Sequence, residues 1–138
     1  MKLERLIAAL GPTEVVGRAP VEIRELAYDS REVPPGALFF CIPGAKADGH
    51  DFAQQAVTAG AAALAVERRL RLDAPQLVVP SVREAMPRAA VEFFDDPTRE
   101  LDVIGVTGTS GKTTTVFLLR SILESAGRNP GLLSSIER

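Results

Sequence analysis

Short apolar runs of strand length alternate with segments of helical periodicity along most of the chain. The runs span residues 37–42, 61–66, 76–79 and 101–106. Each is apolar along nearly its whole length, which is typical of strands in a parallel sheet covered on both faces. The alternation therefore predicts an α/β fold with a largely parallel sheet. Another strand is expected from Val21 to Tyr28, and residues 131–135 can begin one more.

Helices are predicted between these strands. Leucine and isoleucine recur at helical spacing over residues 3–10, and Gly11-Pro12 ends the pattern. Ser81 followed by Glu84 has the spacing of a capping box, so a helix should open there. Pro87 falls inside that helix and should kink it or delay its start. The full set of predicted helices spans residues 3–10, 48–59, 81–94 and 112–126.

Turn-forming residues at Asp96-Pro97-Thr98 interrupt this alternation. We place a domain boundary there, with one unit in residues 1–97 and a second in residues 98–138. The second unit has one strand, one loop, one helix and the possible strand after them, which is too little to cover a parallel sheet on both faces. We therefore expect its domain to continue past Arg138, or the fragment to be only marginally stable by itself.

Composition and charge exclude several classes of protein. Of the 138 residues, 46% are hydrophobic and 25% charged, which is typical of a globular domain. The net charge of −2 provides no basic surface for nucleic acid or for a membrane. No apolar run approaches the roughly 20 residues of a membrane span. The single cysteine, Cys41, lies in an apolar run and is expected to be a buried thiol. We expect a cytoplasmic monomer.

The strongest chemical signal is the turn after residues 101–106. Its sequence is Gly108-Thr109-Ser110-Gly111-Lys112-Thr113-Thr114. Glycine leaves room for backbone N–H groups to surround a phosphate, and the following helix adds free N–H groups and the positive end of its dipole. The Lys112 ammonium can reach the β- and γ-phosphates, and the Thr113 hydroxyl is placed to ligate Mg²⁺. The turn therefore predicts an ATP-type phosphate-binding loop.

This turn departs from the strict pattern Gly-x-x-x-x-Gly-Lys-Ser/Thr. Val106 occupies the place of the first glycine, and Gly105 lies one residue too early. The structural alternative is a glycine-rich strand-to-helix turn with an incidental lysine. Two glycines, the lysine and three threonines together favour phosphate binding over that alternative.

The residues around this loop closely resemble the ATP loop of the Mur ligases, which add amino acids to the peptide of the bacterial cell-wall precursor. The resemblance extends over residues 103–115, Val-Ile-Gly-Val-Thr-Gly-Thr-Ser-Gly-Lys-Thr-Thr-Thr. The family commonly has Val or Ile at the position of Val106, which accounts for the departure from the strict pattern. It usually has Asn where this chain has Ser110, although serine occurs in some members.

The front half of the chain resembles the same family independently. Residues 28–40 carry Tyr-Asp-Ser-Arg-Glu-Val-Pro-Pro-Gly-Ala-Leu-Phe-Phe, which is similar to the "D-S-R-x-V-x-P-G-x-L-F" signature in the N-terminal domain of two family members. Residues 44–52 are similar to the segment that follows, "G-x-x-x-D-G-x-x-F", and residues 93–98 to the segment that leads into the ATP domain. The resemblance covers nearly the whole chain, in the right order.

The resemblance implies an N-terminal mixed α/β domain that binds the UDP end of the precursor, followed by the start of a P-loop ATP-binding domain with a parallel sheet. It implies amide formation driven by ATP with Mg²⁺, through an acyl phosphate that the amine of the incoming amino acid attacks. The run of three threonines and the short linker favour the family member that adds the third amino acid, lysine or diaminopimelate, to UDP-N-acetylmuramoyl-L-alanyl-D-glutamate. The fragment alone is expected to be inactive, because the family's other catalytic residues would lie beyond Arg138.

The resemblance also assigns residues to sites. The positions that match the family's contacts to the UDP precursor are Tyr28, Ser30, Ala45, Lys46 and Ala47. Lys112 is the predicted catalytic residue, because its charge would offset that of the nucleotide, and Thr113 is the predicted ligand of Mg²⁺. The predicted ATP contacts are Gly108, Thr109, Ser110, Gly111, Lys112, Thr113 and Thr114.

Structural alternatives accompany these assignments. From the residues alone, Ser30 is more simply a turn former that caps its own backbone, and Lys46 a solvated loop charge. Asp29 and Arg31 are expected to form an ion pair that holds their loop. His50, the single histidine, is expected on the surface in the first turn of a helix rather than in a catalytic role.

Three other functions stay open from the sequence. One is the sibling Mur ligase that adds the terminal dipeptide. Another is an unrelated P-loop kinase, which a continuation without ligase motifs would favour. The last is a nucleotide-binding module without catalysis.

Overall fold

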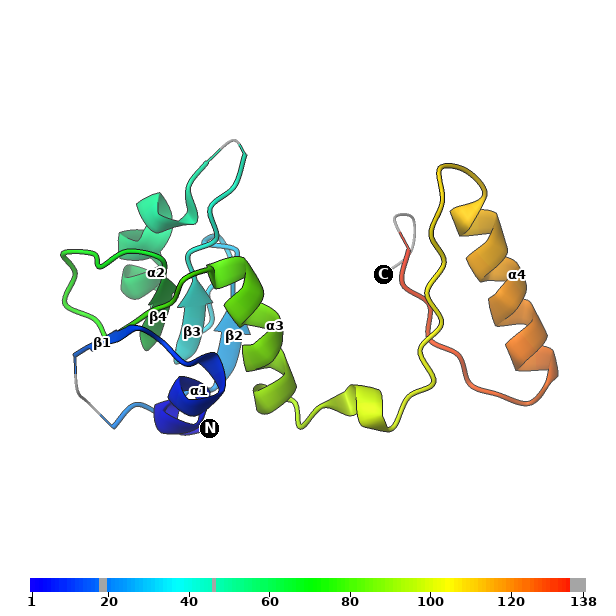
Figure 1. The fold of residues 1–138 in the computed structure, drawn as a ribbon, viewed down its shortest axis with the longest axis horizontal. Helices are drawn as coiled ribbons and strands as arrows, with labels where there is room; N and C mark the ends of the chain where they lie inside the picture. Colours follow the sequence, from blue (N-terminus) through cyan, green and yellow to red (C-terminus); the bar gives the residue numbers. More distant parts are fainter. Residues whose placement is uncertain (18–19, 46, 135–138) are drawn as a thin grey trace. The chain divides into compact units, whose positions relative to one another are not determined.

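The computed structural model describes residues 1–17, 20–45 and 47–134. The chain divides into two compact units, Met1–Arg99 and Glu100–Arg138, two residues after the predicted boundary at 97/98. The first unit holds a five-stranded sheet with three α-helices, and the described part of the second holds one α-helix (Figure 1). The binding roles assigned to the two units remain predictions.

The sheet of the first unit is mixed but mainly parallel. Its strands, in spatial order, are β1 (Glu14–Val16), β5 (Gln76–Val78), β4 (Ala63–Val66), β3 (Ala37–Phe40) and β2 (Glu25–Ala27). The pairs β2–β3, β3–β4 and β4–β5 are parallel, whereas β1 runs antiparallel to β5. The predicted α/β fold with a largely parallel sheet is therefore confirmed for this unit.

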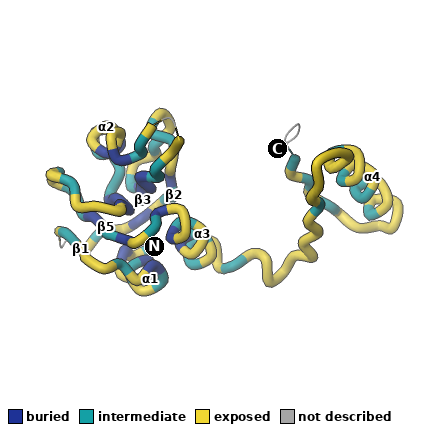
Figure 2. The backbone as a smooth tube through the Cα atoms, turned by 45° about the horizontal axis from the view of Figure 1, so that its top comes forward, coloured by how far each residue is buried: buried dark blue, intermediate teal, exposed yellow. Residues whose placement is uncertain are grey.

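Both faces of the sheet are covered, and the central strand β3 shows why. Leu38 and Phe40 point into a core shared with α1 (Leu3–Leu10) and α3 (Val82–Phe93). Ala37 and Phe39, which alternate with them, point into a second core shared with α2 (Ala53–Ala59). Successive side chains of a strand face opposite sides, so a strand between two helical layers must be apolar at every position. The buried backbone in Figure 2 follows these strands and the inner sides of the helices.

Two helix ends of the first unit match their predicted capping residues, whereas α2 begins at Ala53, after the 3-10 helix η1 (Gly49–Phe52), and not at residue 48 as predicted. The Ser81 hydroxyl accepts a hydrogen bond from the Glu84 N–H at 3.3 Å, which is one half of the predicted capping box. Helix α1 ends at Gly11, whose φ of 56° favours glycine. Pro87 lies inside α3, but the helix already begins at Val82, so the predicted delay of its start is wrong.

Two features of the sheet differ from the sequence-based prediction. Strand β1 was not predicted, because three residues at a sheet edge carry too short a pattern. The strand expected from Val21 to Tyr28 is limited to β2, since residues 21–23 pair with the N-terminus instead. The Leu3 N–H donates to the Val21 carbonyl at 2.9 Å, and the Ile23 N–H donates to the Met1 carbonyl at 2.7 Å.

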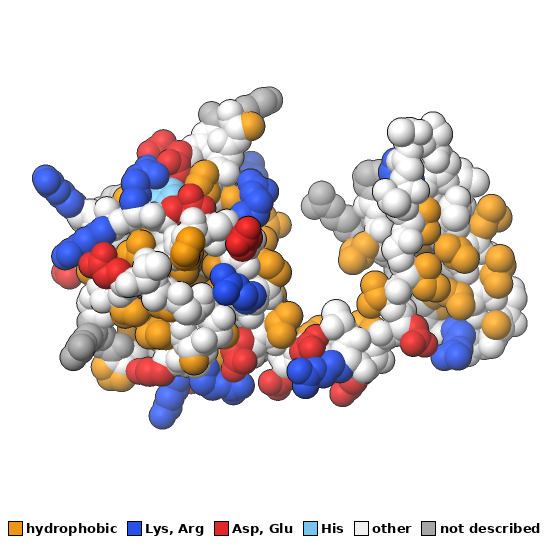
Figure 3. Space-filling view, in the orientation of Figure 1, with side chains coloured by type: hydrophobic (Ala, Val, Ile, Leu, Met, Phe, Trp, Pro, Cys, Tyr) orange, Lys and Arg blue, Asp and Glu red, His pale blue; other side chains and the backbone are white. Residues whose placement is uncertain are grey.

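The second unit contains α4 (Lys112–Ser125), which confirms the helix predicted after the glycine-rich turn. The strand predicted over residues 101–106 is wrong for this structure, as is a strand within 131–134, and Ser135 lies outside the described residues. A strand needs a neighbour for its backbone hydrogen bonds, and the described part of this unit offers none. Leu101 and Val103 are accordingly 62% and 73% exposed, and Figure 3 shows hydrophobic side chains on the surface of this unit.

We expect Leu6→Ala to lower the free energy of unfolding of the first unit by about 2–5 kcal/mol, because Leu6 is fully buried between α1 and the sheet. Val91→Ala on α3 is the control, since Val91 is 48% exposed and should change stability by less than about 0.5 kcal/mol. Urea denaturation followed by circular dichroism measures both. Equal effects of the two substitutions would contradict the described core.

Candidate functional site

The glycine-rich turn before α4 has a backbone geometry that its two glycines permit. Gly108 has a φ of 146° and Gly111 a φ of 76°, both in the region that residues with a side chain rarely adopt. Gly111 is also the N-cap residue of α4, directly before Lys112, and no side chain caps that end of the helix. A Cβ on Gly111 would meet no atom within 4 Å, so a side chain at this position would not clash with its surroundings. The requirement for glycine there therefore comes from the backbone dihedral.

Free backbone donors gather in this turn. In the described part of the chain, the N–H groups of residues 107–114 donate no hydrogen bond, and the first backbone bond of the helix runs from the Thr115 N–H to the Gly111 carbonyl at 2.9 Å. Residues 107–112 are exposed. An exposed run of unpaired N–H groups at a helix N-terminus favours an anion with several acceptor oxygens.

Side chains add a charge and hydroxyl groups to these donors. The Lys112 ammonium folds back across the turn and donates to the Gly108 carbonyl at 2.5 Å. The Thr115 hydroxyl donates to the Gly111 carbonyl at 2.9 Å. Among the described residues, neither the Thr113 nor the Thr114 hydroxyl takes part in a hydrogen bond, so both are available to a ligand or a metal ion.

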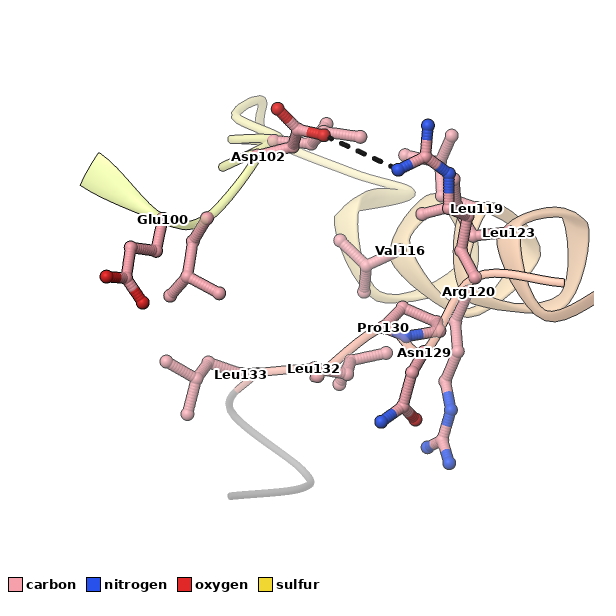
Figure 4. Close-up of a pocket in the computed structure, with 14 residues that line it drawn as sticks. Glu100, Asp102, Val116, Leu119, Arg120, Leu123, Asn129, Pro130, Leu132 and Leu133 are labelled. Carbon is pink, nitrogen blue, oxygen red and sulfur yellow. Dashed lines mark ion pairs between the residues drawn. The ribbon is translucent and has the colours of Figure 1, made fainter. Parts of the chain in front are cut away.

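A hollow in the second unit lies away from this turn. It has a volume of about 450 Å³, and its lining comes from α4, from residues 100–104 and from residues 128–133 (Figure 4). Arg128 and Asp102 form an ion pair of 3.9 Å at its rim. None of the predicted site residues lines it. Its apolar lining comes from Val116, Leu119 and Leu123 on α4 and from the segment 101–104, which was predicted as a strand. A sheet packed on α4 would cover this surface.

The candidate precursor-binding residues of the first unit lie at one edge of its sheet. Tyr28 and Ser30 follow the carboxyl end of β2, whereas Ala45 and Ala47 follow the carboxyl end of β3. Because β2 and β3 are parallel neighbours, these two ends meet at the same edge. Among the described residues, no hydrogen bond or ion pair joins the two pairs, and Lys46 lies outside the described residues. The two pairs thus share an edge, and their binding of the precursor stays a prediction.

The turn after β2 is held by an ion pair, as predicted. Arg31 donates to both carboxylate oxygens of Asp29 through its side chain and to one of them through its backbone N–H. These hydrogen bonds lower the pKa of Asp29 to about 2. The Gln55 side chain donates to the Ser30 carbonyl at 3.2 Å and ties the turn to α2. The Ser30 hydroxyl forms no hydrogen bond in the described part of the chain, and Tyr28 is 67% exposed.

His50 is the clearest correction within the site. The sequence predicted a surface residue, but its side chain is fully buried. Its Nδ1 lies 2.6 Å from an Asp48 carboxylate oxygen, and its Nε2 accepts from the Glu67 N–H at 2.9 Å. The only local signal for this arrangement was Asp48 itself, a capping residue two positions earlier whose carboxylate also accepts from the His50 N–H.

Gln76 is a second buried polar residue that the sequence reading missed. It lies in β5, and its amide bonds the Leu70 N–H and the Leu70 carbonyl at 2.8 and 2.9 Å. Its side chain therefore provides hydrogen-bond partners for backbone groups of the loop between β4 and β5, and its own buried polar atoms are paired in return. By contrast, Cys41 is buried as predicted, and burial raises the pKa of its thiol to about 12.

The profile of the Mur ligase family, described as its catalytic domain, matches residues 22–101. The chain belongs to the Mur ligase family. This match covers strands β2 to β5 and α3 but ends before the glycine-rich turn, so it supports the first unit independently of the phosphate-loop motif.

Curated Mur ligases are similar to the whole chain. A UDP-N-acetylmuramoyl-L-alanyl-D-glutamate–2,6-diaminopimelate ligase of Geobacillus thermodenitrificans is 45% identical over 136 residues, which are 99% of this chain and 28% of that protein. The enzyme of the same name from Halalkalibacterium halodurans is 43% identical over the same shares. The chain thus spans about 28% of the length of the curated relatives that it matches.

Solved Mur ligase structures share the fold. MurF from Acinetobacter baumannii superposes with a TM-score of 0.73 at 32% identity, over 88% of this chain and 27% of that one. MurF from Thermotoga maritima in complex with ADP superposes with a TM-score of 0.60 at 34% identity, over 74% of this chain and 23% of that one.

Two features are absent from the described residues of this Mur ligase chain. Within that part, no helix is long and apolar enough to cross a membrane. The same residues contain no group of three or more His, Cys, Asp or Glu side chains placed to hold a metal ion.

We expect the Asp29 carboxyl to titrate with a midpoint near 2, because Arg31 bonds its charged form. Its pairing stabilises the fold above the ordinary carboxyl pKa of 3.8, and this stabilisation is lost as the pH falls through about 2. In Arg31→Ala the midpoint should return towards 3.8. Carboxyl ¹³C NMR measures it, with Glu32→Gln as the control that keeps the ion pair. An unchanged midpoint in Arg31→Ala would contradict the described turn.

Proposed function

We propose that the chain is the N-terminal part of a ligase that uses ATP to add diaminopimelate to UDP-N-acetylmuramoyl-L-alanyl-D-glutamate. The main support is identity of 43–45% over 99% of the chain to curated ligases of that name. The complete reaction is proposed for a protein of those relatives' length. For the chain itself we propose two tasks: binding the UDP precursor and holding the terminal phosphates of ATP.

The first task is placed at the carboxyl edge of the sheet. In sheets of this kind, ligands bind beyond the carboxyl ends of parallel strands, where loops converge and helices begin. Tyr28 offers an exposed ring on which a uracil can stack, and the Ser30 hydroxyl is free to bond an oxygen of the nucleotide. The backbone at Ala45 and Ala47 borders the same edge. Lys46, outside the described residues, keeps its predicted place beside the diphosphate.

The second task is placed at the turn before α4. The run of unpaired N–H groups from residue 107 to residue 114 fits the oxygens of a phosphate chain. Lys112 would exchange its bond to the Gly108 carbonyl for a bond to phosphate oxygen, since the ammonium already lies across the turn. The unpaired Thr113 hydroxyl fits a place among the oxygen ligands of Mg²⁺. The remaining predicted contacts are Thr109, Ser110, Gly111 and Thr114.

The chemistry of amide formation explains why these groups are needed. A carboxylate is a poor acyl donor until transfer of the γ-phosphoryl group converts it to an acyl phosphate. The amine of the incoming amino acid then attacks the acyl carbon, and phosphate leaves. Both the nucleotide and the carboxylate are anionic, so the Lys112 charge and the N–H groups of the turn lower the repulsion between them, and Mg²⁺ would supply further positive charge.

The second unit also fits the start of a larger ATP-binding domain. Residues 101–106 are mostly apolar and strand-like in sequence, but in the described structure they pair with no strand, and all except Val106 are exposed. We propose that they form the strand before the phosphate loop once neighbouring strands pair with them. Without such strands the chain is expected to be inactive as a ligase.

The second candidate is the sibling ligase that adds the terminal dipeptide. It is favoured by the fold similarity to MurF, at 32–34% identity. The higher identity and fuller coverage of the diaminopimelate ligases favour the first candidate. An unrelated kinase is disfavoured, because membership of the Mur ligase family rests on residues 22–101, outside the phosphate loop. Nucleotide binding without catalysis is the remaining alternative for the full-length protein.

We expect UDP-N-acetylmuramoyl-L-alanyl-D-glutamate to bind the chain, and Ser30→Ala to weaken binding about three- to tenfold through loss of one hydrogen bond. Isothermal titration calorimetry measures both. Thr58→Ala is the matched control, because that hydroxyl donates to the Gln54 carbonyl within α2. Absence of any binding heat at millimolar precursor would overturn the first task.

For the second task, Lys112→Ala should weaken binding of ATP with Mg²⁺ about 10- to 100-fold, since it removes a charged donor to the phosphates. Lys2→Ala removes a similar charge at the N-terminus of the first unit and serves as the control. Displacement of a fluorescent ATP analogue provides the readout. If both variants bound ATP as the unaltered chain does, Lys112 would have no part in the site.

A further inference from the structure

A short hairpin carries the proposed precursor contacts after β3. Its described residues are 43–45, 47 and 48, and an antiparallel bridge between Pro43 and Asp48 closes it. The Gly44 N–H donates to the Ala47 carbonyl at 3.0 Å, one residue inside that bridge. One hydrogen bond and a two-stranded turn are too few to hold such a hairpin by themselves. Contacts from outside the hairpin must therefore fix its orientation.

Gly49 brings the hairpin into close contact with the end of β3. Its N–H donates to the Ile42 carbonyl at 3.0 Å. A Cβ at this position would lie 2.5 Å from the Ile42 nitrogen and 2.6 Å from its carbonyl oxygen. Such distances exclude any side chain, so the backbone approach itself depends on glycine. The hairpin base is thus pressed against the carboxyl edge of the sheet.

The buried His50 side chain links this base to the rest of the sheet. Its Nε2 accepts from the Glu67 N–H at 2.9 Å, so this nitrogen carries no proton, and the neutral ring must carry its proton on Nδ1. Nδ1 lies 2.6 Å from Asp48, which therefore accepts from it. One buried imidazole consequently joins the base of the hairpin to the residue that follows β4.

Charged groups around the imidazole support this tautomer. The Asp48 carboxylate also accepts from Arg68 at 2.9 Å, and hydrogen bonds from the His50 backbone and side chain hold the pKa of Asp48 well below its ordinary range. Asp48 is therefore a charged acceptor at neutral pH. The Glu67 carboxylate turns away from the ring and accepts from the Val82 N–H at 2.9 Å, at the start of α3.

A second link reaches the hairpin from α3. The Arg83 guanidinium donates to the Pro43 carbonyl at 3.2 Å. The hairpin base is thus fixed at both of its strands, by Arg83 at Pro43 and by His50 through Asp48. The imidazole is the buried member of these links, because Arg68 and Arg83 are exposed.

From this network we infer that His50 is a positioning residue for precursor binding. Its two ring nitrogens hold the base of the 43–48 hairpin against β4, so that the backbone at Ala45 and Ala47 is presented to the UDP precursor at the carboxyl edge. The inference rests on the proposed precursor-binding function. His50 touches no substrate in this scheme and acts only through the hairpin.

The test compares three substitutions of His50 in the 138-residue chain. His50→Ala removes both ring contacts, His50→Asn keeps a donor near Asp48, and His50→Gln keeps an acceptor near the Glu67 N–H. Calorimetry with UDP-N-acetylmuramoyl-L-alanyl-D-glutamate should show affinity about tenfold weaker in His50→Ala. His50→Asn and His50→Gln should lie between His50→Ala and the unaltered chain, because each keeps one of the two ring contacts. Leu6→Ala is the matched control, because it destabilises the opposite core without touching the hairpin.

Loss of stability must be distinguished from loss of precursor affinity. All variants are compared at a temperature at which thermal denaturation shows them to be folded. If His50→Ala then bound the precursor with unaltered affinity, the positioning role would be wrong. Leu6→Ala should lose stability yet keep its affinity. Should His50→Ala fail to fold, the affinities of His50→Gln and Arg68→Ala for the precursor are compared with that of Leu6→Ala instead. Arg68 is exposed and donates to Asp48 at the base of the hairpin.

Hydrogen exchange separates this inference from the proposed function. The Gly44 and Gly49 amides should exchange faster in His50→Ala than in Leu6→Ala, in the absence of any ligand. If the unaltered chain did not bind the precursor, the proposed function would fail, while faster exchange would still support the hairpin fastening. Unchanged exchange at both amides would overturn the inference whatever the ligand does.

Discussion

The parallel pairing of β2, β3, β4 and β5 is the constraint on which the first unit depends. Parallel neighbours cannot be joined by a tight hairpin, so each connection must cross a face of the sheet and return to its amino edge. Helix α2 makes one such crossing between β3 and β4, and α3 covers the other face with α1. The carboxyl ends of the strands then share one edge, which brings the turn after β2 and the hairpin after β3 to adjacent positions.

Burial on both faces also explains which parts of the fold the sequence could predict. A strand such as β3 must be apolar at every position, and this leaves a clear run in the sequence. Edge strand β1 has only Val16 partly buried, so three residues provide no usable pattern. Residues 21–23 look like the start of a strand, but their partners are residues at the N-terminus of the chain, which periodicity cannot reveal.

In the second unit, features that depend on consecutive residues could be predicted from the sequence, whereas features that depend on distant residues could not. Glycine dihedrals, a helix start and free N–H groups depend on a few consecutive residues, so the geometry of the turn at 108–114 followed from its sequence. A strand depends on a partner that can lie anywhere in a chain. Residues 101–106 have the composition of a strand but no partner among the described residues, so Leu101 and Ile104 remain exposed beside the stripe of α4. A buried strand thus needs an apolar sequence, but it also needs a neighbouring strand to pair with.

The candidate site shows the same division. The Asp29–Arg31 pair spans two residues and was predictable, whereas the burial of His50 depends on Glu67, which follows a different strand. Asp48, Gly49 and His50 form a continuous segment in which each residue has a different physical task. The carboxylate caps the following turn, the glycine permits contact with β3, and the imidazole fills a buried position with one donor and one acceptor. A lone histidine after an aspartate and a glycine is therefore better read as a connection between loops than as a surface residue, provided that a backbone N–H from another strand reaches its second nitrogen.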